Sequence, residues 1–128
     1  MNVAYVDTSC VVAIAFEEPG YEAVAGTLAG FDVLLSSNLL EAELLAVLVR
    51  EGVPGRLEEL VAGFRWILPD RTLRSEIRRV AAKGYVRGAD LWHLACALLV
   101  DPKASELVFA TLDENQGRLA GSLGFPLL

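Results

Sequence analysis

The sequence predicts an α/β fold built around a parallel sheet, and three observations support this prediction. Short apolar runs alternate along the chain with longer stretches whose apolar residues recur at helical spacing. The first run, Val3–Val6, is apolar at consecutive positions, as in strands that are buried on both faces of a parallel sheet. Prolines and glycines, which interrupt regular structure, separate many of the segments.

The expected elements follow one another closely along the chain. The expected strands are 3–6, 32–36, 66–68, 107–110 and 125–128. The expected helices are 8–16, 21–29, 38–52, 56–64, 71–84, 91–100 and 113–120. Pro19–Gly20 ends the first helix, Gly30 the second, and Gly52–Gly55 turns the chain after the third. Pro69 ends the third strand, and Gly121 closes the last helix. With no internal repeat or linker, residues 1–128 are expected to form one domain.

Hydrophobic residues make up 54% of the chain, which is enough for a core without disulfides. An apolar run such as Leu94–Val100 is far too short to cross a membrane. The first residues lack the basic and apolar regions of a signal peptide. We therefore expect a cytoplasmic protein that has no membrane partner.

The two cysteines, Cys10 and Cys96, lie in apolar, helix-like surroundings without CxxC spacing. We interpret them as buried free thiols. A zinc site would need more ligands than two cysteines and the single histidine, His93.

The net charge of −6 argues at first against nucleic-acid binding, but the charge is unevenly distributed. Residues 65–87 hold seven bases and two acids, whereas the segments on either side are acidic. This basic segment can contact phosphates locally, or it can be a solvated helix face.

Four acids stand at the ends of predicted elements. Asp7 and Asp113 follow apolar strands, Asp90 begins a helix, and Glu43 borders the apolar face of the helix 38–52. Strand ends and helix starts meet along one rim of an open α/β sheet, so we expect these carboxylates to gather there.

Three of the four acids also have a purely structural interpretation. Asp7 can cap the helix that follows it. Glu43 can pair with Arg50, two turns further along its helix. Asp113 fits the first turn of a helix that is capped by Thr111 and Glu114.

Carboxylates that share one rim repel each other, and a bound divalent cation removes that repulsion. Ligation by acids and waters suits Mg²⁺ or Mn²⁺. One or two such ions can activate water for attack on a phosphodiester. The acids therefore predict metal-dependent hydrolysis at phosphorus.

The chain resembles PIN-domain proteins, and in particular the VapC-like toxin ribonucleases of type II toxin–antitoxin systems. The matching pieces are Tyr5–Ser9, Ala42–Leu45, Arg87–Ala95, Thr111–Asp113 and the closing Ala120–Phe125. The four pieces that carry the acids occur in the order and at the spacing of the family, and the resemblance covers essentially the whole chain.

The resemblance implies a three-layer α/β/α sandwich with a central parallel five-stranded sheet, and a Mg²⁺- or Mn²⁺-dependent endoribonuclease. Asp7, Glu43, Asp90 and Asp113 would be the catalytic and metal-binding acids, and Ser9 would support them through a hydroxyl contact. The implied partners are an RNA substrate, a cognate antitoxin and a second copy of the chain in a homodimer.

Other interpretations remain open at this level. His93 is either a core or supporting residue or a general base, and Trp92 either packs or stacks on a base. An aspartate-based phosphotransfer domain would need a second Asp at position 9, where Ser stands, or a lysine after a late strand. A catalytically silent PIN-like RNA- or protein-binding module would have lost one or more of the acids, and none is missing.

Overall fold

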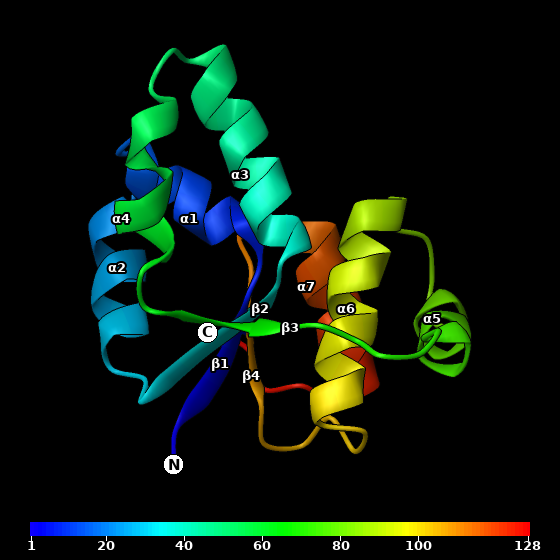
Figure 1. Cartoon of the computed structure of the whole chain (residues 1–128). Coiled ribbons are helices and arrows are strands. Elements are labelled where there is room, and N and C mark those ends of the chain that lie inside the picture. The colour runs from blue at the N-terminus through cyan, green and yellow to red at the C-terminus, as the bar shows by residue number, and fades with distance from the viewer.

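The computed structural model describes residues 1–128 and contains one parallel sheet of four strands. The strands are β1 Val3–Val6, β2 Val33–Ser37, β3 Phe64–Ile67 and β4 Val108–Ala110. Their order across the sheet is β3-β2-β1-β4, which places β1 in the interior. Figure 1 shows helices on both sides of this sheet, as expected for an α/β/α arrangement.

The helices alternate with the strands as the sequence predicts, with small shifts at their ends. They are α1 Thr8–Ala15, α2 Tyr21–Ala29, α3 Leu39–Arg50, α4 Leu57–Val61, α5 Arg74–Ala81, α6 Gly88–Val100 and α7 Glu114–Leu123, with a 3-10 turn at Pro54–Arg56. The expected helix 56–64 is shorter, because Phe64 already belongs to β3, where it pairs with Leu34. No helix has the length and apolar character needed to cross a membrane.

Strand β1 is buried on both faces, which confirms the interpretation of its apolar run. Ala4 and Val6 belong to a core that packs against α1, α2 and α3, whereas Tyr5 belongs to a second core with α6 and α7. Alternation of side chains along a strand produces this division. Figure 1 shows the same two groups of helices on opposite sides of the sheet.

The prediction of a fifth strand at 125–128 was wrong. The C-terminal segment makes only an isolated bridge between Phe109 and Leu127, together with a hydrogen bond from Phe109 N–H to the Pro126 carbonyl at 2.8 Å. Pro126 lacks an N–H donor, so it cannot extend a ladder of backbone hydrogen bonds. Phe125 instead turns into the core, where its ring centroid lies 6.0 Å from that of Phe109.

Both cysteines are free and buried, as predicted. Burial raises the pKa of the Cys10 thiol to about 12 and that of Cys96 to about 11. Both residues are therefore protonated packing groups at neutral pH.

Candidate active site

The carboxyl ends of β1 and β4 bring two of the predicted acids to one edge of the sheet. Val6 pairs with Ala110, and the N–H of Asp7 donates to the Ala110 carbonyl at 2.8 Å. The Asp7 side chain is buried and accepts a hydrogen bond from the Ser9 N–H at 3.1 Å, so it also caps α1. The capping interpretation is therefore correct, but the capping hydrogen bond engages only part of the Asp7 carboxylate.

Asp113 lies at the start of α7, and it caps this helix itself. Its Oδ1 accepts a hydrogen bond from the Gln116 N–H at 2.8 Å. The prediction that Thr111 caps the helix was wrong. The Thr111 hydroxyl instead lies 2.7 Å from Gln116 Oε1, to which it donates. The helix cap lies two residues later than predicted, and the Thr111 hydroxyl instead binds the buried amide of Gln116.

That amide, Gln116, is a site residue that we did not predict. Its side chain is fully buried, and its Nε2 donates to Asp7 Oδ1 at 3.3 Å and to the Asp90 carbonyl at 3.3 Å. A buried polar group needs hydrogen-bond partners, and here these partners are parts of the acidic site. A glutamine in the first turn of a helix gives no local signal of such a role.

Glu43 projects from α3 toward the same edge of the sheet. Its Oε1 lies 2.8 Å from the Thr8 hydroxyl and 2.8 Å from His93 Nε2, and both groups donate to it. Arg50 pairs instead with Glu51 at 3.2 Å, so the predicted alternative of a Glu43–Arg50 pair was wrong. Burial acts to raise the pKa of Glu43, but the hydrogen bonds from His93 and Thr8 outweigh it and lower the pKa.

Asp90 lies in the first turn of α6, and its carboxylate is 3.5 Å from Arg87 Nε. Burial and the negative charge of Asp7 raise the pKa of Asp90, Arg87 opposes the shift, and Asp113 adds to it. Asp7 and Asp113 therefore lie within electrostatic reach of Asp90, and both destabilise its ionised form.

All four predicted acids line one cleft of about 400 Å³. Glu18, which we did not predict as a site residue, is a fifth acid in the lining of this cleft. Arg87 is the single basic residue there. An open cleft that holds five carboxylates and one guanidinium attracts cations.

The acidic cleft fits a hydrated hard cation better than a closed metal cage. No three Asp, Glu, His or Cys side chains converge closely enough to form a complete metal cluster. Mg²⁺ keeps several of its waters and is commonly held by one or two carboxylates. The donors in the cleft are carboxylates, and the repulsion at Asp90 is the kind that a bound cation relieves.

Ser9 connects the two loops at the cleft. Its Oγ accepts the Leu112 N–H at 3.0 Å and lies 3.4 Å from the Thr111 hydroxyl. The structure places Ser9 beside the acids but without a direct side-chain contact to any of them. Trp92 is partly buried against the core, and its indole N–H donates to Ser37 Oγ at 3.0 Å.

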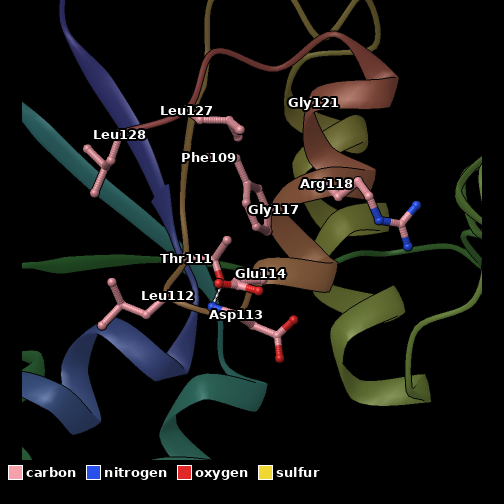
Figure 2. A pocket seen from close by; sticks show the side chains of 10 residues that line it. All are labelled: Phe109, Thr111, Leu112, Asp113, Glu114, Gly117, Arg118, Gly121, Leu127 and Leu128. Carbon is pink, nitrogen blue, oxygen red and sulfur yellow. Dashed lines mark hydrogen bonds between the residues drawn. The ribbon is translucent and has the colours of Figure 1, made fainter.

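A second cavity, of about 490 Å³, adjoins the acidic cleft along β4 and α7. Figure 2 shows its apolar wall, formed by Phe109, Leu127 and Leu128. The two cavities share only Leu112 and Asp113, and the other three predicted acids do not line the second one. The acidic cleft is therefore the candidate active site.

Comparison with known families agrees with this architecture. The sequence model of the PIN domain matches residues 4–122, a segment that contains all four predicted acids. No curated protein matches the chain. Because the match covers most of the sequence, this chain belongs to the PIN-domain family.

Proposed function

We propose that this protein is a divalent-metal-dependent endoribonuclease that hydrolyses RNA phosphodiester bonds. The observation that carries the proposal is the cleft in which Asp7, Glu43, Asp90 and Asp113 face the same space. PIN domains are commonly nucleases, and the family generally binds RNA. The intact acidic set favours catalysis over a silent binding module.

In this proposal the four acids of the cleft would hold a hydrated Mg²⁺ or Mn²⁺, directly or through its waters. A bound cation of this type supplies charge neutralisation at the phosphate and a water of lowered pKa. The chain supplies carboxylates whose positions are set in advance. The N–H of Ser9 and the amide of Gln116 orient Asp7, and the Gln116 N–H orients Asp113. Such preorganisation reduces the cost of arranging ligands and substrate.

The basic helix α5 is the proposed contact for the RNA backbone. Arg74 and Arg78 are exposed, lie one turn apart, and make no ion pair. In contrast, Arg71 is engaged by Glu76 at 2.6 Å. Helix α5 packs against α6, whose first turn carries Asp90. Free guanidinium groups on α5 can neutralise phosphates of an RNA that also reaches the acidic cleft.

We further propose that the protein is the toxin of a toxin–antitoxin pair, on the basis of its resemblance to VapC-like proteins. Five carboxylates in an open cleft suit an arginine from an antitoxin segment, because charge-assisted pairs with carboxylates are strong. A homodimer belongs to the same proposal, and size-exclusion chromatography with light scattering tests it directly.

The decisive experiment is cleavage of structured RNA by the purified chain, with Mg²⁺, Mn²⁺ or EDTA, and with Asp90→Asn as the matched variant. We expect internal cleavage that needs the cation and disappears in Asp90→Asn. RNA binding without cleavage by the folded wild type would favour the silent binding module. Equal cleavage by both proteins would show that the acidic cleft is not the site.

A further inference from the structure

His93 lies at the centre of a buried hydrogen-bond chain that connects β1 to the acidic cleft. Its side chain is fully buried in α6 and does not line the cleft. Its Nδ1 lies 2.6 Å from the Tyr5 hydroxyl, and its Nε2 lies 2.8 Å from Glu43 Oε1. Both ring nitrogens are therefore engaged, on opposite sides of the imidazole.

The direction of each hydrogen bond follows from the groups at the two ends. The N–H of Ser37 donates to the Tyr5 hydroxyl oxygen at 3.1 Å, which leaves the hydroxyl proton of Tyr5 to be donated to Nδ1 of His93. Ionised Glu43 can only accept, so Nε2 of His93 must carry a proton. A neutral imidazole that is protonated at Nε2 gives a donor and an acceptor to both of its short hydrogen bonds, the one with Tyr5 and the one with Glu43.

We propose that His93 is a positioning residue, held by Tyr5 in the Nε2–H tautomer, that presents Glu43 to the cation of the cleft. The inference rests on the proposed function only in that it takes Glu43 as a cation ligand. Oε1 of Glu43 accepts from both Thr8 and His93, whereas Oε2 has no hydrogen-bond partner. The fixed Oε1 leaves Oε2 as the oxygen that is available in the cleft.

The geometry excludes a direct catalytic role for His93. A general base must reach the proton that it removes, directly or through one water, and His93 has no exposed surface. Nor is His93 an ordinary core residue, since its ring bridges a buried tyrosine and a partly exposed acid. Groups that orient a metal ligand through a hydrogen bond typically contribute about 10–100-fold to metal affinity.

The first test uses the fact that His93 is the only histidine of the chain. A long-range ¹H–¹⁵N spectrum of the metal-free protein, recorded above the usual histidine pKa of about 6.5, therefore reports this residue alone. We expect a protonated Nε2 and an unprotonated Nδ1. An Nδ1–H tautomer or a mixture of the two would overturn the proposal, because Glu43 would then lose its donor.

The second test measures Mn²⁺ binding by electron paramagnetic resonance of the free ion, without RNA. His93→Leu removes the donor to Glu43, and we expect the affinity to fall by about 10–100-fold. His93→Gln places an amide N–H near the position of Nε2, and we expect it to recover most of the loss. Equal affinity for wild type and His93→Leu, or equal loss in both variants, would overturn the proposal.

Trp92→Phe is the matched control. It also removes a hydrogen bond to Ser37, the residue whose N–H holds Tyr5, but the indole makes no hydrogen bond to His93 or Glu43. We expect unchanged Mn²⁺ affinity. If the wild type binds no Mn²⁺, the proposed function fails, and the nitrogen spectrum alone decides whether Tyr5 and Glu43 hold His93. If Mn²⁺ binds as predicted but no RNA is cut, only the nuclease proposal fails.

Discussion

Nε2 of Gln116 lies 3.3 Å from Oδ1 of Asp7, although 109 positions separate the two residues in the sequence. The amide thus joins the last helix to the acid that follows the first strand. Its Oε1 is held by Thr111 at 2.7 Å, so the orientation of the amide is set from its other end. Asp7 is therefore positioned by a side chain that touches no solvent.

Gln116→Met keeps the length of the side chain and removes both polar atoms. We expect the free energy of unfolding to fall by about 1–3 kcal/mol, because the partly buried Thr111 and the buried Asp7 lose a partner. RNA cleavage should fall as well, since Asp7 is released. Urea denaturation measures the stability change. Ser122→Ala, on the exposed side of the same helix, is the control, with an expected change within about 0.5 kcal/mol. A fully stable Gln116→Met variant would show that the amide carries no structural role.

Asp90→Asn should abolish cleavage and yet stabilise the metal-free protein. Burial and the charge of Asp7 raise the pKa of Asp90 in the folded state. The folded protein then binds its proton more tightly than the unfolded chain does, so stability falls as pH rises through the raised pKa. The amide side chain of the variant carries no charge, so this fall in stability with rising pH disappears. We expect a higher Tm at neutral pH in EDTA, and a flatter dependence of Tm on acidic pH.

Asp101→Asn is the control with the opposite sign. Burial acts to raise the pKa of Asp101, but backbone N–H groups of Glu106, Leu107 and Ser105 outweigh it and lower the pKa. This carboxylate stabilises the fold above its unfolded pKa, so its loss should lower Tm at neutral pH. A lower Tm for Asp90→Asn as well would mean that the contact of Asp90 with Arg87 stabilises the fold by more than the repulsion from Asp7 and Asp113 destabilises it.

Ser9→Ala tests the support that joins the two loops at the cleft. The variant loses the oxygen that accepts the Leu112 N–H at 3.0 Å, and we expect a cost of about 1 kcal/mol in stability. Cleavage should fall because the loop that carries Asp113 is less well held. Ser9→Thr retains the hydroxyl and should stay closer to the wild type in a side-by-side RNA cleavage assay. Wild-type activity in Ser9→Ala would show that the Ser9 hydroxyl does not support the site.

The arginine pair of α5 is tested by RNA binding in the Asp90→Asn background, which prevents cleavage. We expect Arg74→Glu with Arg78→Glu to weaken binding across RNA sequences. If both residues contact phosphates of single-stranded RNA, the slope of log affinity against log salt falls by about 1.4. Arg50→Glu is the matched control, because Arg50 is exposed on α3 but already pairs with Glu51. Equal binding by all three proteins would leave α5 as a solvated face.

The sequence alone determined most of the elements and the strand and helix ends at which the acids stand. An apolar run such as Val3–Val6 specifies a buried strand through its own residues, and parallel strands necessarily bring their carboxyl ends to one edge. The positions of Asp7 and Asp113 after β1 and β4 were therefore predictable, and so was a shared cleft. The PIN-domain match over residues 4–122 agrees with this reading of the chain.

Only the tertiary structure decided which groups hold those acids. From the sequence, Glu43 has Arg50 as its neighbour on the same helix, but packing of α3 against the sheet gives it His93, 50 positions away. Gln116 reaches Asp7 in the same way. The predicted fifth strand was also wrong, because Phe125 packs on Phe109 and the segment after it makes only an isolated bridge. Local patterns extend over a turn or two, whereas these partners depend on the order of strands and the placement of helices across the whole sheet.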